Sequence, residues 1–226
     1  DALKTQAENL GNAYTASGAD GKVAAMASIW GTERTGANYQ AALVMTARAA
    51  ALINPSSDHV AQADGLIASM LTAGLDRSAA RWSNIVSGGS LGWALVTLGA
   101  PGRVTMADYG DLDEFYGNDN SLNGHKSALL LAGLAGLGRI ESGAQSDFAG
   151  DLKVNIARQT AWSKAISAAA DRGEQGTVAL MVTAGMQAPS WAVVPAHHLY
   201  YIVRSLRQVG LEAEARMIAA EAVTFG

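Results

Sequence analysis

Apolar side chains recur at helical spacing along most of this chain, and the clearest case is VPAHHLYYIVRSLRQVGLEAEARMIAAEA at residues 194–222. Residues three and four positions apart lie on one face of an α-helix, so such a series gives the helix an apolar stripe that has to be buried. The stripe predicts a helix packed against a core over 195–209. It consists of Leu199, Ile202, Val203, Leu206 and Val209.

A short turn follows this helix and is repeated elsewhere. Gly210 suits the left-handed position after a helix end, Leu211 can fold back on that helix, and Glu212 favours the start of the next one. The sequence therefore predicts a helical hairpin here. Related turns occur as Gly74-Leu75-Asp76 and at Gly138, before Ile140 and Glu141.

These turns resemble those of TPR-like helical repeat proteins, which stack helical hairpins into a solenoid with a groove for other proteins. The resemblance covers three turns only. Their glycines, at 74, 138 and 210, fit no fixed 34-residue period, and the TPR pattern of Trp, Leu, Gly and Tyr is missing. The resemblance implies an α-solenoid that binds another protein.

Strand-like alternation is scarce, and proline occurs only four times in 226 residues. We therefore expect an all-α fold of about 10 to 12 helices, an array or solenoid-like stack of antiparallel hairpins. It should form one domain over 1–226, with a seam at 100–120. Helices are expected at about 1–17, 21–31, 37–53, 57–73, 77–87, 90–98, 121–138, 147–171, 174–185, 195–209 and 212–224.

The expected helix 121–138 carries small residues at i, i+4 and i+8, namely Ala128, Ala132 and Gly136. Such a ridge lets another helix approach closely. Interior glycines cost about 1 kcal/mol each relative to alanine, so tight packing should compensate for Gly133 and Gly136. We expect this helix to be central and buried.

Composition narrows the classes of partner. A net charge of -4 gives no positive field for a phosphate backbone, so nucleic acid is not expected as a partner. The absence of cysteine excludes disulfides and thiolate zinc sites. The longest apolar run, 128–138, is only about half as long as the ~20 residues that a membrane-spanning helix needs, so no membrane span is expected. The chain begins with Asp1 instead of Met, which slightly favours a periplasmic or otherwise exported protein.

An acidic stretch, DYGDLDEFYGNDNSLNGHK at 108–126, is a candidate ligand loop. Asp119, Ser121 and Asn123 occupy positions 1, 3 and 5 of a calcium loop, and Gly124 occupies position 6. Position 12 is Leu130 instead of the usual glutamate, so any calcium in this register would be held weakly. Calcium is the one cofactor that the sequence suggests.

The same stretch places aromatic residues beside Asp111, Asp113 and Glu114. Aromatic faces stack on sugar rings, and two carboxylates set ~5 to 9 Å apart can cleave a glycosidic bond. Residues 108–119 are therefore a candidate carbohydrate site. The interpretation that we favour is a solvated acidic connector whose aromatic side chains pack into the neighbouring helices.

Residues 88–92 form a G-x-S-x-G sequence around Ser90, which resembles the nucleophile elbow of α/β-hydrolases. Such an elbow implies a strand before the serine and a helix after it, followed downstream by an acid and a histidine. Asp111 or Asp113, with His197 or His198, would keep that order. The preceding residues look helical, however, and a tight turn with Ser90 as the cap of the next helix explains the same sequence.

Opposite the apolar stripe of helix 195–209 lies a polar one, His197, Tyr201, Arg204 and Gln208. If this helix lines a groove, the stripe supplies an aromatic ring and a guanidinium, which are enriched at binding hot spots. The alternative is solvated surface. These four residues are the candidate partner-binding site.

Five tryptophans are spread along the chain, and each should anchor its segment in the core with the indole N-H bound to a partner. Trp191, in PSWAVVP, marks an ordered connector. A ligand cage built from several tryptophans is the alternative.

The favoured function is a non-catalytic helical scaffold that binds another protein or peptide through a groove or helix face. The alternative is an enzyme, either a hydrolase that uses Ser90 or a carbohydrate-active protein that uses the acids of 108–119.

Overall fold

A computed structural model describes residues 2–226, with side chains from residue 4 onward. Within these residues, the regular structure is helical, and the single isolated bridge joins Ala107 to Ile140. The all-α prediction is confirmed, with thirteen α-helices in the described range. They are α1 (Ala2–Thr15), α2 (Gly18–Trp30), α3 (Gly36–Ala51), α4 (Ala63–Thr72), α5 (Asp76–Ala80), α6 (Leu91–Gly99), α7 (Tyr109–Gly117), α8 (His125–Leu137), α9 (Ser142–Asp151), α10 (Ala161–Asp171), α11 (Gln175–Gly185), α12 (Ala196–Gln208) and α13 (Glu212–Phe225), with short 3-10 helices η1 (Ser57–Gln62), η2 (Leu122–Gly124) and η3 (Trp191–Val193).

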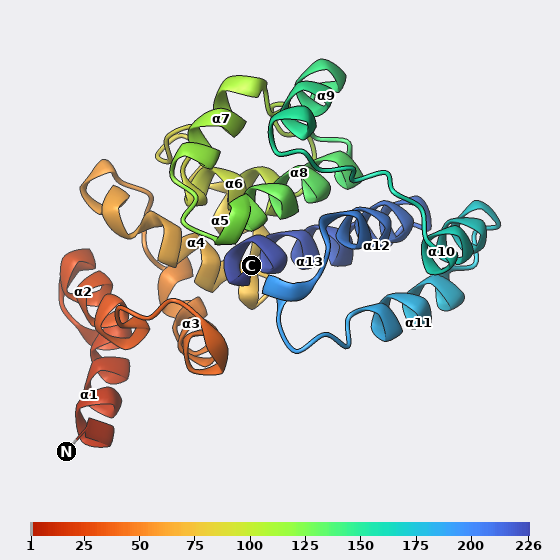
Figure 1. Ribbon diagram of the computed structural model, residues 1–226. Coiled ribbons are helices and arrows are strands. Elements are labelled where there is room, and N and C mark those ends of the chain that lie inside the picture. Colours follow the sequence, from red (N-terminus) through yellow and green to blue (C-terminus); the bar gives the residue numbers. More distant parts are fainter. Residues whose placement is uncertain (1) are drawn as a thin grey trace.

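The helices surround a central group made of α4, α6, α8, α12 and α13 (Figure 1). Helices α1 to α3 form one end of the molecule, and α10 and α11 form the other. Helices α7 and α9 pack on each other and on α8. One cluster of buried apolar residues extends from Ala13 to Val223, so the end groups share a core with the centre.

Helix α8 is buried along nearly its whole length, as its small residues predict. A Cβ added at Gly136 would lie 2.9 Å from Cβ of Val203 in α12. One added at Gly133 would lie 3.0 Å from Cδ2 of Leu98 in α6 and 3.1 Å from Cβ of Ala219 in α13. The two glycines therefore allow three helices to approach the α8 backbone.

The three predicted glycine turns are confirmed. Gly74, Gly138 and Gly210 have φ values of +72°, +66° and +86°, in the left-handed region. After Gly210, the Leu211 N-H donates to Leu206 O and the Gly210 N-H donates to Arg207 O, which is the Schellman pattern. The other two turns have the same pair of bonds, and Gly173 makes a fourth turn of this kind between α10 and α11.

Two buried arginines bind the carbonyl end of α6. Arg139 Nη1 donates to Thr97 O at 2.8 Å and to Leu98 O at 3.0 Å, and Arg216 Nη1 donates to Gly99 O. Cations are favourable at a helix C-terminus because of the orphan carbonyls and the helix dipole. Burial and, to a lesser extent, the nearby positive charge of Arg216 lower the pKa of Arg139 to about 10.

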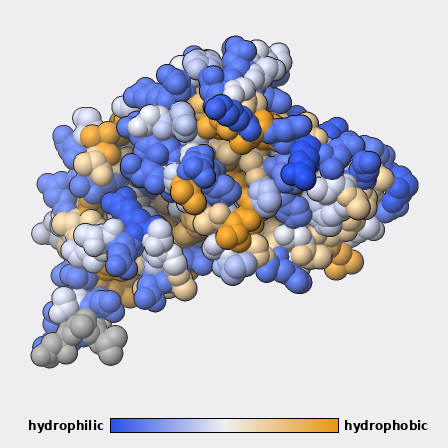
Figure 2. All heavy atoms as spheres, viewed as in Figure 1, coloured by the Kyte–Doolittle hydropathy of each residue, from blue (hydrophilic) through white to orange (hydrophobic). Residues whose placement is uncertain are grey.

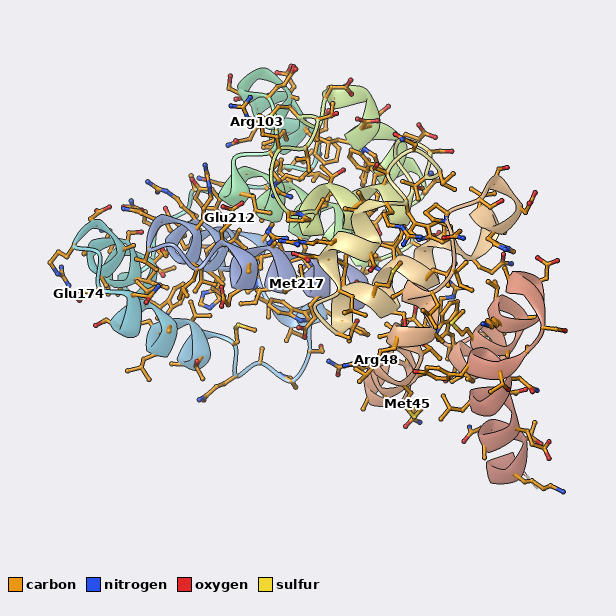
Figure 3. All side chains as sticks on the ribbon, turned by 180° about the vertical axis from the view of Figure 1, so that it is seen from behind. Met45, Arg48, Arg103, Glu174, Glu212 and Met217 are labelled. Atoms are coloured by element: carbon orange, nitrogen blue, oxygen red, sulfur yellow. The ribbon has the colours of Figure 1, made fainter. Side chains whose placement is uncertain are left out.

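Each arginine also meets an acid that follows one of the glycine turns. Arg139 lies 3.7 Å from Glu212, and Arg216 lies 2.9 Å from Asp76. Figure 3 shows Glu212 where α13 begins, near the middle of the molecule. The acids of the repeated turns therefore contact arginines from other helices.

The contacts of α13 are not limited to its neighbours in sequence. It packs on α12 and α8, and also on α4 and α6 from the first half of the chain. A solenoid repeat contacts only adjacent repeats. The structure is a stack of helices, as predicted. The contacts of α13, however, differ from those in a simple solenoid.

Several of the expected helix ranges were wrong. The helix expected at 77–87 ends at Ala80, as α5, and residues 57–62 of the helix expected at 57–73 form the 3-10 helix η1. The helix expected at 147–171 is two helices, because α9 ends at Asp151 and Lys153 adopts a left-handed φ of +54°. Thr160 then starts α10 in a capping box with Ser163. Residues 109–117, read as loop, form helix α7, with Asp108 as the N-cap. Asp1, where the first expected helix starts and on which the expectation of export rests, lies outside the described residues.

In the part of the chain that the structure describes, every helix is too short or too polar to cross a membrane.

Candidate functional site

Ser90 is the N-cap of α6. Its Oγ accepts from the Trp93 N-H at 3.1 Å and donates to Ser87 O at 2.7 Å. Asp64 Oδ1 accepts from the Gly92 N-H at 2.7 Å, so two side chains satisfy the amino end of this helix. The described residues contain no strand before Ser90. The capping interpretation of this serine is confirmed.

Asp119 organises the start of α8. Its Oδ1 accepts from the Ser121 N-H at 2.8 Å, and its Oδ2 accepts from the N-H and Oγ of Ser127 at 2.8 and 2.6 Å. Burial alone would raise the pKa of Asp119, but these hydrogen bonds outweigh burial and lower it. Both carboxylate oxygens thus already have protein donors.

Two residues of the expected calcium loop have an unusual backbone conformation. Asn123 and Gly124 both lie in the left-handed region, with φ values of 55° and 66°. Ser121 Oγ accepts from the Lys126 N-H at 2.8 Å. Within residues 4–226, no three His, Asp or Glu side chains gather closely enough to hold a metal ion.

The acids before Asp119 lie on the short helix α7. Asp113 and Glu114 are exposed, whereas Asp111 is half-buried against Gly88. Burial raises the pKa of Asp111, and the neighbouring Asp108 raises it further.

The aromatic residues of this stretch contact the protein itself. Phe115 is buried, and Tyr109 and Tyr116 pack edge-on against Phe148 of α9 at centroid distances of 6.4 and 6.2 Å. The Tyr109 hydroxyl donates to Asp151 at 2.7 Å. These contacts agree with the interpretation of the stretch as a connector whose aromatic side chains pack into neighbouring helices.

The four residues of the polar stripe on α12 differ in exposure and in hydrogen bonding. Tyr201 is buried, and its hydroxyl donates to Ala157 O at 2.9 Å; its expected exposure is therefore wrong. Gln208 Nε2 donates to Asp171 of α10 at 2.8 Å. Arg204 remains exposed, and His197 is half-buried. On the other side of α12, Leu199, Ile202, Val203 and Leu206 of the apolar stripe are buried as predicted, and Val209, the C-cap, is half-buried.

The histidines of α12 lie near the ends of α10 and α11. His198 stacks on Trp162 with ring centroids 3.9 Å apart, and its Nε2 lies 3.0 Å from Gly185 O. Burial lowers the pKa of His198, while the bond to Gly185 opposes that change. Burial also lowers the pKa of His197, helped by Arg158 and His198. Neither ring lines the hollow that contains Ser90.

Three surface hollows meet at residues 35–37, where the chain enters α3. The α1–α3 hollow, of about 750 Å³, is lined by Thr35, Gly36, Ala37 and residues of α1 to α3. The Trp191 hollow, of about 310 Å³, shares Gly36 and Ala37. The Ser90 hollow, of about 590 Å³, shares Thr35 and contains Asp64, Asp119 and Lys126. We refer to these three hollows together as the Thr35 groove.

The side chains around the Thr35 groove carry more negative than positive charge. Glu33 lines the first hollow, Glu221 lines the second, and Asp64 and Asp119 line the third, where Lys126 is the basic residue. Burial raises the pKa of Asp64, although the Gly92 N-H and Arg34 oppose that change. Burial also lowers the pKa of Lys126. The groove therefore suits a neutral or cationic ligand better than an anionic one.

Helix α3 and the residue after it present apolar side chains to solvent, and one of them, Met45, lines the first hollow. Val44, Met45 and Leu52 are 51%, 48% and 66% exposed. Met45 and Arg48 point outward from α3 in Figure 3. The space-filling view shows further apolar surface in the middle of the face seen there, near the C-terminal end of the chain (Figure 2). Apolar surface flanked by polar residues is typical of a binding surface.

The pairing of Trp191 with Glu221 was not predicted. Trp191 Nε1 donates to Glu221 Oε1 at 3.3 Å, across 30 residues of sequence. PSWAVVP indicated an ordered segment, but no local pattern indicates which acid meets the indole. The role of Thr35 was not predicted either. The sequence TERTGANY indicates a turn, but nothing in it indicates three adjoining hollows.

No protein-family model, curated protein or solved structure matches this chain. The resemblance to TPR-like proteins therefore depends on the glycine turns alone.

Proposed function

We propose that this protein is a helical scaffold that binds an extended segment of another protein in the Thr35 groove. The observation that carries the proposal is the meeting of three hollows at residues 35–37. A peptide that crosses residues 35–37 would contact apolar side chains of the hollows on either side of α3. Peptide recognition commonly uses such a groove, with pockets for individual side chains.

Burial supports this location over the polar stripe of α12. Tyr201 and Gln208 already bind residues of the same chain, which leaves Arg204 and part of His197 for a partner. Ala37, in contrast, is exposed and lines two of the hollows. The exposed apolar residues of α3 extend the surface beyond the groove.

Display of random 12-residue peptides on the purified protein tests the proposal. We expect enriched peptides whose synthetic versions bind with micromolar affinity, measured by fluorescence anisotropy. Ala37→Trp fills the shared wall of two hollows without altering the core and should weaken binding about tenfold or more, or ~1.4 kcal/mol.

The matched control is Ala213→Trp. Ala213 is also an exposed alanine at the second position of a helix, and it lies outside the lining of the Thr35 groove. This variant should bind the peptides as the unmodified protein does. A screen that enriches no peptide, or peptides that bind Ala37→Trp with full affinity, would rule out the groove as the binding surface.

A further inference from the structure

The Trp191 hollow combines aromatic walls with a single charge. Trp191, Phe225, Pro189 and Val194 contribute apolar surface, and the one charged side chain in its lining is Glu221. Its volume of about 310 Å³ is at the lower end of the range for small-ligand sites, so it suits one side chain and not a large molecule.

The aromatic wall is fixed in place from two sides. Trp191 is only 9% exposed, its indole N-H is bound to Glu221 Oε1, and its backbone O lies 3.0 Å from Nε2 of His125 in α8. Phe225 packs edge-on against Tyr39 of α3, with centroids 6.0 Å apart. A ligand would therefore find the two rings already positioned, which reduces the entropic cost of binding.

Glu221 keeps one carboxylate oxygen for a ligand. Its Oε1 accepts from the indole, and among the described residues Oε2 has no hydrogen-bond or ion-pair partner. A carboxylate beside aromatic faces attracts a cation through both its charge and the ring quadrupoles. The lining of this hollow contains no lysine, arginine or histidine that would neutralise Glu221.

Two helix ends also contribute to the field in this hollow. Gly36 and Ala37 belong to the positive amino end of α3, while Phe225 belongs to the negative carboxyl end of α13. Each end is equivalent to roughly half an elementary charge, and the two have opposite signs, so they largely cancel. The full charge of Glu221 then decides the sign of the field.

We propose that the Trp191 hollow is a specificity pocket for a cationic side chain, either the guanidinium of arginine or the ammonium of lysine. The proposal rests on the proposed function in one respect, since the cation is then carried by the bound segment of the partner protein. The cation lies against the rings of Trp191 and Phe225 and bonds to Glu221 Oε2.

Indole N-H signals in an NMR titration test the pocket without any peptide. The probes are n-propylguanidinium and n-butylammonium, which mimic the two side chains, and n-butanol, which is neutral. Trp191→Phe identifies the Trp191 signal among those of the five tryptophans. We expect saturable shifts of that signal with at least one cation, at millimolar concentrations, and shifts at least tenfold weaker with n-butanol.

Glu221→Gln removes the charge and keeps an oxygen that can accept from the indole, so it should weaken cation binding about tenfold or more. Glu214→Gln, an exposed change on the same helix, is the control and should have no effect. Gln40→Lys, an exposed residue of the same hollow, adds a positive charge without touching the Trp191–Glu221 pair and should also weaken binding.

The proposal fails if n-butanol shifts the Trp191 signal as strongly as both cations, or if Glu221→Gln and Gln40→Lys leave the affinity unchanged. This result is distinct from failure of the peptide screen. Enriched peptides that need no Lys or Arg would support the peptide-binding groove and contradict the cation pocket. Cation binding without any enriched peptide would support the pocket and contradict the peptide-binding groove.

Discussion

Arg216 and Asp76 are 140 residues apart in sequence, and their Nη1 and Oδ2 atoms lie 2.9 Å apart. The same guanidinium donates to the carbonyl of Gly99 at the end of α6. Arg216 is only 6% exposed, so this ion pair joins α13, α5 and α6 inside the core. A buried pair of this kind is costly to break because the remaining charge keeps no partner.

Arg216→Met should therefore lower the free energy of unfolding by up to roughly 3 to 5 kcal/mol, because it leaves the Gly99 carbonyl without this donor and Asp76 with only the Arg77 N-H. Urea unfolding measures the change. Asp76→Asn should lower the free energy of unfolding much less in the Arg216→Met variant than in the unmodified protein, since the two residues interact. Strictly additive losses in the double variant would contradict the pairing.

Gly136→Ala should destabilise the protein even though alanine is the better helix former. The added Cβ meets the Val203 side chain at 2.9 Å and the Arg204 backbone N at 3.2 Å, and overpacking of this kind typically costs about 1 to 3 kcal/mol. Gly176→Ala, in a helix with nothing within 4 Å, serves as the comparison and should be neutral or slightly stabilising. Equal thermal midpoints for the two variants would contradict close packing at Gly136.

Ser90→Ala should cost about 1 kcal/mol, the usual loss for an N-cap, with Asp64 still holding the Gly92 N-H. Turnover of short ester substrates should be at background in both the unmodified protein and the variant. Ester hydrolysis that disappears in the variant would instead identify Ser90 as a nucleophile.

Asp119→Asn should destabilise the start of α8 by roughly 1.5 to 3 kcal/mol, because hydrogen bonds to a charged acceptor are lost. The folded pKa of Asp119 is lowered from the ordinary 3.8, so its contribution is complete above that value and declines as the pH falls below it. Acid unfolding of the variant should lose that part of the pH dependence. Millimolar calcium should leave the melting temperature unchanged, and an increase that needs Asp119 would instead support an ion site.

The two α12 histidines should make the protein less stable in mild acid. Burial lowers their folded pKa values below 6.5, so the unfolded chain binds protons first as the pH falls below about 6.5. Stability should be highest above that pH and then decline, with a slope of at most about 1.4 kcal/mol per pH unit for each histidine. His198→Gln should reduce the slope in urea unfolding between pH 6.5 and 5, and an unchanged slope would contradict this cause.

The sequence predicts what is local and misses what depends on distant partners. The apolar stripe of α12 and the turn glycines at 74, 138 and 210 act within a few residues, and the structure has them as expected. Helix α7 was missed because its acids and glycines favour a loop, whereas its buried Leu112 and Phe115 hold it on the core. The break near Lys153 has no proline to mark it, and the left-handed position is a lysine, whereas the nearby Gly150 lies inside α9.

The candidate sites follow the same rule. Ser90 was recognisable as a cap because its partner, Trp93, is three residues away. Tyr201 was expected on an exposed stripe, since nothing near it in sequence reveals that Ala157 covers it. The Thr35 groove joins residues from α1 to α13, and periodicity carries no information about which of them become neighbours.

The position of α13 also sets an order of events during synthesis. Gly99 precedes Arg216 by 117 residues, so at typical translation speeds the ribosome needs about 6 to 23 s to supply the arginine after it has made α6. During that interval α4 and α6 have been made but lack the cover of α13. The nascent chain therefore completes this core only when α13 emerges, and until then its apolar helices are open to chaperones or to aggregation.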